Sequence, residues 1–488
     1  MTQPPKLVRK LTLQDSILLL AGGIIGSGIF LTAQEVSLNT RTPLLFLAVW
    51  ALGLLITIPA CFAFAEMGAM FPDSGGQYVY LREAYGDFVA FLYGWMIFTV
   101  SNGGTIAALG VGFALYLGSV FPALETSHAV GTLGPVVLHG HRFAISGHTL
   151  LALGDHALSF TLTRGHLVAL SAIAVQTLIN IFGVRQGAIL QNIATWAKFA
   201  AIAAFVVLGL ALGKGSWAHY STSIPAAAGS PGMLAGIGVA LIAVFWAYDG
   251  WVYITWVAGE VIDPKRNLPR SLILGLLLVG AIYLSINAVY VYALPLTGIA
   301  QETAVAQAAA VSMFSSRAAN WLALMIALSC FGAMASCIMT GARVYYAMAE
   351  DGVFFRALAR VHPRWRTPVM SLVLQSAWAG GLALSGQYDQ LFTYVMFMMV
   401  LSYVMTTAGL FVLRRKMPDA ERPYRCTGYP WLPAIYVLLG GLWFINALFQ
   451  RPREAGWGTF IVLLGVPFYL YWRRQKRSAK AAEPSTPS

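Results

Sequence analysis

The strongest constraint on the fold is a series of long apolar runs along the whole chain. Hydrophobic residues make up 58% of the 488 positions and charged residues 10%, whereas a soluble domain carries about 25% charged residues. A helix needs about 20 apolar residues to cross a bilayer. The sequence therefore predicts an all-α polytopic membrane protein with twelve transmembrane helices, at 16–37, 43–70, 84–120, 166–183, 189–212, 233–260, 270–296, 318–350, 368–385, 388–413, 430–449 and 456–472.

The basic residues are distributed unevenly between alternate loops. Of the 31 Lys and Arg residues, 23 fall in one set of loops and tails, seven in the opposite loops, and one, Lys198, within a span. An excess of Lys and Arg marks cytoplasmic loops. We therefore expect a multi-pass protein of the cell (plasma or inner) membrane with a cytoplasmic segment at 1–15 and a basic, disordered cytoplasmic tail at 473–488. The net charge of +12 then reflects topology and does not indicate nucleic-acid binding.

The first apolar run contains an unusual cluster of glycines, in the stretch AGGIIGSGIF at 21–30. An interior glycine costs a helix about 1 kcal/mol relative to alanine. One interpretation is a helix broken at mid-depth, whose free N–H groups around Gly26, Ser27 and Gly28 face an anion. The other is close helix packing, because Gly22 and Gly26 also form a small-xxx-small pair. From this stretch alone the two interpretations are about equal.

A second interruption occurs in the sixth span, where FWAYDGW at 245–251 places Asp249 and Gly250 inside an apolar segment. Four spans separate it from the first, and the two segments run in opposite directions. Interrupted helices at matching positions of two inverted halves are typical of the binding site of an inverted-repeat transporter. This pairing makes packing alone the weaker interpretation of the glycine cluster.

Two further charged residues need an explanation. Lys198 lies well inside the fifth span, where a lysine costs about 2.5–3.5 kcal/mol on insertion scales. Snorkelling to the surface is less favourable for Lys198 than a functional role, because the span continues for more than ten residues to Lys214. Glu66 is near the end of the second span, and we expect it at the interface rather than buried.

Histidine and cysteine give little support for a metal site. The longest outer loop holds six histidines, of which His139 and His141 are the only close pair, so a solvated loop is favoured over a metal site; the six are His128, His139, His141, His148, His156 and His166. The four cysteines, Cys61, Cys330, Cys337 and Cys426, fall in spans or on the cytoplasmic side, so no structural disulfide is expected. We predict neither a metal nor a cofactor.

Several motifs, in this order and spacing, resemble the amino acid–polyamine–organocation superfamily, and within it the L-type amino acid transporters and their bacterial exchanger relatives. The motifs are GGIIGSGIF (Gly22–Phe30), FAEMGAMFPDSGGQYVYLREAYGDFVAFLYGW (Phe64–Trp95), INIFGVRQGAILQNIATWAKFAAI (Ile179–Ile202), FWAYDGW (Phe245–Trp251), GEVIDPKRNLPR (Gly259–Arg270) and SCFGAMASCIMTGARVYYAMAEDG (Ser329–Gly352). The resemblance implies a LeuT-type core, a 5+5 inverted repeat at 16–413 with discontinuous helices 1 and 6. It places helices 11 and 12, with the preceding loop, outside this core at 414–472.

The resemblance also implies a substrate site at the two interruptions. The amides of Gly26, Ser27 and Gly28 and the Ser27 hydroxyl would take the substrate carboxylate. Carbonyls near Ile24 and around Phe245, Trp246 and Ala247 would take its α-ammonium. Trp246 corresponds to the aromatic gate over the substrate, and Lys198 to a lysine that replaces a sodium ion.

The chain departs from the family pattern at three places. Trp246 replaces the more usual phenylalanine, and Asp249 stands where eukaryotic members often have glycine. Asp249 would contact a cationic or hydroxyl-bearing substrate side chain, pair within the protein, or cap the helix break. The loop after the third span lacks the cysteine that joins animal members to an accessory subunit, so we expect no disulfide-linked partner. Further wall residues are expected among 102–105, Val252 and Tyr253.

These features together predict a sodium-independent transporter of L-amino acids, most simply an exchanger of neutral amino acids that works by alternating access. The alternative is a proton-coupled symporter of amino acids or polyamines, with Lys198 or Asp249 titrating. An amino acid sensor that does not transport is a third hypothesis. No catalytic motif lies within the spans and no repeated ring of charges is present, which argues against an enzyme and against a channel.

Overall fold

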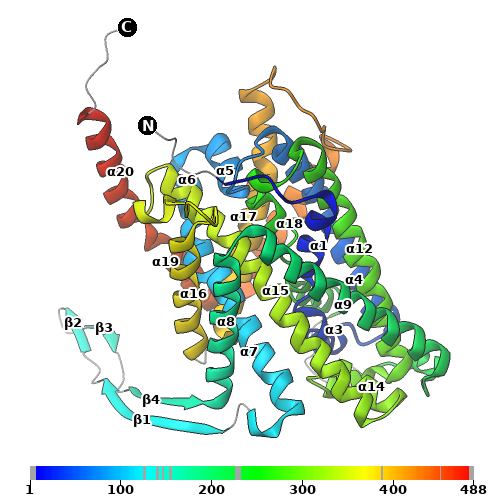
Figure 1. Cartoon of the computed structure of the whole chain (residues 1–488). Coiled ribbons are helices and arrows are strands. Elements are labelled where there is room, and N and C mark those ends of the chain that lie inside the picture. The colour runs from blue at the N-terminus through cyan, green and yellow to red at the C-terminus, as the bar shows by residue number, and fades with distance from the viewer. Residues whose placement is uncertain are drawn as a thin grey trace.

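The computed structural model describes residues 7–124, 128–138, 142–145, 148–152, 156–225, 232–385, 388–450 and 452–482. The chain forms a bundle of helices with both termini at one end (Figure 1). The longer helices are α1 (Leu13–Ile24), α4 (Pro43–Met70), α7 (Asn102–Val120), α8 (Arg164–Ile181), α9 (Val184–Leu212), α10 (Met233–Tyr248), α12 (Pro264–Ala293), α15 (Ser316–Glu350), α16 (Val369–Leu384), α17 (Tyr388–Lys416), α18 (Trp431–Gln450), α19 (Pro452–Leu463) and α20 (Gly465–Ala482).

Within these described residues, seven helical stretches are long and apolar enough to cross a membrane. They are Leu13–Leu31, Pro43–Met70, Asp87–Val120, Arg164–Ile181, Val184–Leu212, Pro264–Ala293 and Ser316–Glu350. Shorter apolar helices lie at Met233–Tyr248, Val369–Leu384 and Trp431–Ile445. Each corresponds to a predicted span, and the chain is a multi-pass helical membrane protein.

Both predicted interruptions are present. Helix α1 ends at Ile24, and the chain becomes helical again in α2 (Gly28–Leu31) and α3 (Ala33–Thr40). Helix α10 ends at Tyr248, and a short helix α11 follows at Tyr253–Trp256. Asp249 takes an extended conformation and Gly250 has φ +102°, a region that favours glycine because it has no Cβ. The polar and glycine residues therefore end the helices where the sequence placed the breaks.

The broken helix α1 lies at the centre of the bundle, in contact with α9, α12 and α15. Helix α12 packs along α4, and α15 packs along α7. The third span consists of α6 (Asp87–Met96), a π-helical turn η1 (Ile97–Ser101) and α7. Such turns often occur beside functional sites. Here the turn lies immediately before Asn102 and Thr105, which the sequence analysis listed as possible wall residues.

The all-α prediction is incomplete, because the long loop forms strands β1 (Ala129–Leu138), β2 (Arg142–Ile145), β3 (His148–Ala152) and β4 (His156–Thr163). Strand β1 pairs with β4 and β2 with β3, both antiparallel, at the end of the bundle away from the termini (Figure 1). Valine, threonine and leucine in these segments favour strands. His139 and His141, the one close histidine pair, lie outside the described residues.

Two predictions near the bundle surface are wrong. In the tail predicted to be disordered, residues 473–482 are helical, since α20 runs to Ala482, and residues 483–488 lie outside the described part of the chain. Arginine, lysine, glutamine and alanine are good helix formers. Glu66 is fully buried rather than interfacial. Its carboxylate accepts hydrogen bonds from Arg414 at 2.6 and 3.0 Å and lies 3.2 Å from Arg422. The two arginines come from a distant part of the chain and compensate the buried charge.

Candidate functional site

The two helix interruptions lie against each other in the middle of the bundle. A Cβ at Gly28 would come within 3.0 Å of the Ala247 Cα, and a Cβ at Gly250 within 3.4 Å of the Gly23 backbone. Glycine at 28 and 250 therefore lets the two backbones approach closely. The packing interpretation of the first stretch also has support, because a Cβ at Gly22 would collide with side chains of α9.

The carbonyl end of α1 is held by side chains from two other helices. Lys198, which is 3% exposed, donates from Nζ to the carbonyl oxygens of Gly22 at 2.8 Å and Ile25 at 2.9 Å. The Ser329 hydroxyl donates to the same Ile25 oxygen at 2.9 Å. A helix C-terminus carries partial negative charge, so a lysine is favourable there. Lys198 thus neutralises the end of the first half-helix.

A tyrosine that the sequence analysis missed connects the two interruptions. The Tyr283 hydroxyl of α12 lies 2.8 Å from the Ala247 carbonyl oxygen and 3.1 Å from the Ile24 carbonyl oxygen. Both carbonyls lie at the ends of helices, where the regular backbone hydrogen bonding stops. The Ile24 carbonyl also accepts from the Gly26 amide at 2.8 Å, so Tyr283 is its second partner. The sequence carried no signal for this role, since YLSINAVY around Tyr283 reads as an ordinary apolar helix.

On the other side of the first interruption, the chain presents the backbone amides that begin helix α2. Helix α2 begins at Gly28, and α3 continues it through Thr32, whose backbone is also in the right-handed helical region. The first amides of such a helix have no intrahelical acceptor and form the positive end of its dipole. This stretch could therefore hold a carboxylate, with the buried Ser27 hydroxyl beside it.

A small cavity of about 30 Å³ lies at the interruptions. Its walls are Gly23, Ile24, Gly26, Ser27, Gly28, Thr105, Ala108, Leu109, Trp246, Asp249 and Tyr253. Six of the eight residues predicted to bind substrate are among them. A single water needs about 10–15 Å³, so an amino acid would need the walls to move. Trp246 is partly exposed and lies over Gly28, which makes it the wall residue best placed to do so.

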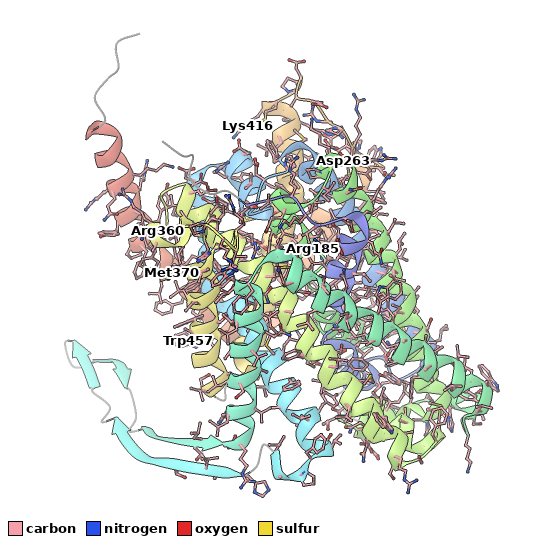
Figure 2. All side chains as sticks on the ribbon, in the orientation of Figure 1. Arg185, Asp263, Arg360, Met370, Lys416 and Trp457 are labelled. Atoms are coloured by element: carbon pink, nitrogen blue, oxygen red, sulfur yellow. The ribbon has the colours of Figure 1, made fainter. Side chains whose placement is uncertain are left out.

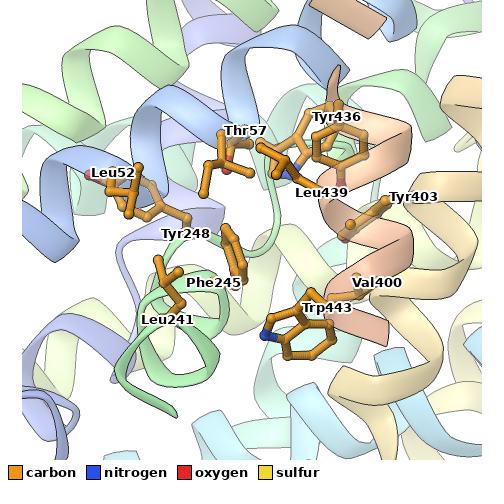
Figure 3. A pocket seen from close by; sticks show the side chains of 13 residues that line it. Leu52, Thr57, Leu241, Phe245, Tyr248, Val400, Tyr403, Tyr436, Leu439 and Trp443 are labelled. Carbon is orange, nitrogen blue, oxygen red and sulfur yellow. The ribbon is translucent and has the colours of Figure 1, made fainter. Parts of the chain in front are cut away.

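The structure places three predicted residues outside the cavity walls. Ala247 is buried against Gly28 and contributes its carbonyl to Tyr283. Lys198 lies behind the α1 carbonyls. Phe245 points into a separate apolar cavity of about 340 Å³ between α4, α10, α17 and α18 (Figure 3). Of the expected wall residues Thr105 and Tyr253 are in place. The amide of Asn102 instead donates to Gln375 at 3.1 Å.

Asp249 lines the small cavity and is hydrogen-bonded to a residue that lines the larger one. Its backbone caps α10, and its side chain lines the small cavity while accepting a short hydrogen bond from the Tyr403 hydroxyl. Tyr403 lines the larger apolar cavity (Figure 3). Of the interpretations left open by the sequence, the internal pair is present, and Asp249 occupies the C-cap position of α10 through its backbone only. The carboxylate also remains within reach of a molecule in the small cavity.

The side of the site toward the chain termini is closed by direct contacts. The Arg343 guanidinium forms an ion pair with the Glu260 carboxylate at 2.6 Å, and both side chains are fully buried. The backbone amides of Lys10 and Leu11 donate to the Glu260 carbonyl at 2.8 and 2.9 Å. In the turn after α4, the Gly75 amide donates to the backbone carbonyl of Trp256 at 2.8 Å. The N-terminal segment is thereby fixed across the end of α11.

Comparison with known proteins agrees with this architecture of two interrupted helices. The family model described as "Amino acid permease" matches residues 11–470. The chain belongs to this family. The permease is also 29% identical to the serine/threonine exchanger SteT of Bacillus subtilis (strain 168), over 98% of its own length and 100% of the relative's. Its family and relatives are transporters and not enzymes.

Two human proteins are similar over almost the same length. The b(0,+)-type amino acid transporter 1 is 29% identical, with 97% of the permease and 91% of the relative aligned. The large neutral amino acids transporter small subunit 2 is 28% identical, with 94% and 80% aligned. These matches place the permease in the L-type branch of the amino acid–polyamine–organocation superfamily and support amino acid transport.

Proposed function

We propose that this permease is a sodium-independent exchanger of small neutral L-amino acids. The observation that carries the proposal is the meeting of two interrupted helices around one cavity. The start of α2 offers amides there, and the end of α1 offers carbonyls that accept from Lys198, Ser329 and Tyr283 in this conformation. A zwitterionic amino acid has the complementary charges at fixed separation. The amides of Ser27 and Gly28 and the Ser27 hydroxyl take its carboxylate, joined by the Gly26 amide once it releases the Ile24 carbonyl. The carbonyls of Ile24 and 245–247 take its ammonium, which replaces the Tyr283 hydroxyl at Ile24 and Ala247.

Lys198 provides the reason for sodium independence. Its ammonium group already donates to two carbonyl oxygens at the end of α1. Unwound carbonyls of this type are where a coupled cation binds in inverted-repeat transporters. An ammonium fixed at this position supplies the same positive charge as a bound ion, so the site has no need of sodium. Because no ion gradient then drives transport, exchange of one amino acid for another is the simplest transport cycle.

The conformational cycle follows from the different contacts on the two sides of the cavity. Glu260, Arg343 and the N-terminal segment close the side toward the termini, which we place in the cytoplasm on the basis of the basic loops. Trp246 covers the opposite side and is partly exposed. We propose a LeuT-type core at 16–413, with 414–472 packed outside it, in which these two closures open alternately.

Asp249 and Tyr403 set the side-chain preference. Because the Asp249 carboxylate is engaged by Tyr403 and also lines the small cavity, a hydroxyl-bearing side chain such as serine or threonine can share it without needing a full positive charge. One relative is named as a serine/threonine exchanger, in agreement with this preference. The proposal includes no disulfide-linked partner subunit.

Binding of unlabelled amino acids to the purified permease tests the substrate class. We expect L-serine, L-threonine and L-alanine to raise the thermal unfolding midpoint, and D-serine and polyamines to leave it unchanged. Stabilisation by a polyamine alone would favour the alternative symporter. Binding of L-serine without any uptake into proteoliposomes would instead identify a sensor.

A further inference from the structure

A second polar pocket lies outside the substrate site, at the end of the bundle that carries both termini. Its volume is about 340 Å³, and it is lined by Val8, Lys10, Phe182, Gly183, Val184, Arg185, Gln186, Arg364, Trp365 and Arg366. Arg185 lies where α8 meets α9 (Figure 2). Three separate parts of the chain form the walls: the N-terminal segment, the turn between α8 and α9, and the loop before α16.

The pocket has four basic side chains and no acidic one. Within the described residues, none of the side chains of Lys10, Arg185, Arg364 and Arg366 forms an ion pair or hydrogen bond with a carboxylate. By contrast Arg343, on the nearby helix α15, has a carboxylate partner. All four side chains are exposed. Four cations around one concave space create a positive potential that attracts an anion.

The walls are held in place independently of any ligand. The loop before α16 is fixed by His362, whose Nδ1 accepts from the backbone amides of Arg364 and Trp365, both at 3.2 Å. The His362 ring also stacks on Trp365 with centroids 4.1 Å apart, and Trp365 meets Phe182 edge-on at 5.1 Å. The pocket is therefore a built site and not a chance gap between mobile arginines.

We propose that this basic pocket binds a phosphate-bearing anion, either the headgroup of an anionic phospholipid or free phosphate. Arginine guanidinium groups match phosphate oxygens in paired hydrogen bonds. Helix α9 begins at Val184 in the pocket wall, so its first amides and dipole add to the attraction. Phe182 is 51% exposed, as expected for an aromatic residue at the level of lipid headgroups.

The anion has a second effect, because it bridges parts of the chain that the transport cycle separates. Val8 and Lys10 in the pocket wall belong to the segment whose backbone holds the Glu260 carbonyl. A phosphate bound to Lys10 and to the arginines of the other two walls ties this segment to the α8–α9 turn. The bound anion therefore stabilises the conformation that is closed on the side of the termini. This second effect rests on the alternating-access cycle proposed above.

Thermal unfolding of the purified full-length permease tests the proposal. We expect phosphatidylglycerol in mixed micelles to raise the unfolding midpoint by about 2 °C or more over phosphatidylcholine. The triple variant Arg185→Gln, Arg364→Gln, Arg366→Gln should lose this rise. If inorganic phosphate in neutral lipid reproduces the rise, the ligand is free phosphate; if it does not, the ligand is the lipid headgroup.

A matched control removes the same charge elsewhere. The triple variant Arg356→Gln, Arg415→Gln, Arg425→Gln changes three exposed arginines that do not line the pocket, and it should respond like the parent protein. An equal rise in the pocket variant and the parent, or no rise with either anion, would overturn the proposal.

Trypsin cleavage after Arg9 and Lys10 provides a readout that needs no variant. The anion should slow this cleavage in the parent protein by several-fold, because it fixes the N-terminal segment. Unchanged cleavage at saturating phosphatidylglycerol and at saturating phosphate would contradict the bridging role. Neither readout uses transport, so failure of the exchange proposal would leave these results intact.

Discussion

The Nζ atom of Lys198 lies 2.9 Å from the carbonyl oxygen of Ile25, at the point where the first half-helix ends. The same nitrogen donates to the Gly22 carbonyl at 2.8 Å. A side chain from the fifth span thus completes the hydrogen bonding of the broken first span. Because the broken helix forms one wall of the substrate cavity, the position of Lys198 connects the fold directly to binding.

Replacement of Lys198 by alanine should abolish exchange. The substitution leaves the Gly22 carbonyl without its side-chain donor, at about 1–3 kcal/mol, and leaves the Ile25 carbonyl with Ser329 alone. It also removes the charge beside the cavity. Uptake of labelled L-serine into proteoliposomes measures the loss, which we expect to exceed tenfold. Lys214→Ala is the control, because Lys214 is exposed near the end of the same helix. Normal exchange by Lys198→Ala would remove the assigned role.

Alanine at position 28 should separate the two interruptions. The added Cβ would come within 3.0 Å of the Ala247 Cα, a contact that only a backbone shift can relieve. We expect at least a tenfold loss of L-serine exchange with the protein still folded. Gly381→Ala is the matched control, since nothing lies within 4 Å of its Cβ. Equal activity of the two variants would show that the close approach is unimportant.

The hydroxyl of Tyr283 should matter for transport more than that of a neighbour on the same helix. Tyr283→Phe removes a hydroxyl whose single proton is shared between carbonyls at the two interruptions, a contact worth about 0.5–1.5 kcal/mol. Tyr290→Phe removes a buried hydroxyl that has no partner among the described residues. Initial rates of exchange should fall several-fold for the first variant and stay near the parent value for the second. The reverse order would refute the bridging role.

The pair of Asp249 and Tyr403 should control selectivity. Tyr403→Phe frees the Asp249 carboxylate while keeping the ring, so a substrate with a positive side chain gains a counter-ion. Competition of L-lysine against labelled L-serine should therefore become stronger in this variant. The gain in lysine competition should be lost in the double variant that also carries Asp249→Asn. An unchanged lysine-to-serine ratio in Tyr403→Phe would indicate that Asp249 acts only as a cap.

The buried ion pair between Glu260 and Arg343 should show strong coupling. Either single substitution, Glu260→Gln or Arg343→Met, leaves a buried charge without its partner, at a cost of about 3–5 kcal/mol. The double variant removes both charges and should recover part of the lost thermal stability. The unfolding midpoints of the parent, the two single variants and the double variant give the coupling between the two side chains. Additive losses would mean that the two side chains do not stabilise each other.

The sequence was sufficient to predict the features that depend on local chemistry. Gly26 and Gly28 in the first span and Asp249 with Gly250 in the sixth are poor helix formers. Their matching positions in two opposed spans favoured a break over close packing. Lys198 stood out because a charge inside an apolar span needs a partner. The family resemblance then supplied the cavity residues, six of which line the cavity.

Contacts between distant segments could not be predicted in the same way. Tyr283 and Ser329 lie in ordinary apolar helices, and only the packing of α12 and α15 against α1 brings their hydroxyls to the broken backbone. Glu66 was placed at the interface because its partner arginines are more than 300 positions away in the chain. Phe245 faces away from the cavity because the last turn of α10 points it toward α18.

A counterflow experiment distinguishes exchange from the other transport cycles. Labelled L-serine uptake would be measured in sodium-free buffer, into proteoliposomes that are either empty or preloaded with unlabelled L-serine, at equal pH on both sides. We expect uptake to be at least tenfold faster into the preloaded vesicles, with no change when sodium is added. Equal uptake into empty and preloaded vesicles, or uptake only with sodium or a proton gradient, would contradict exchange.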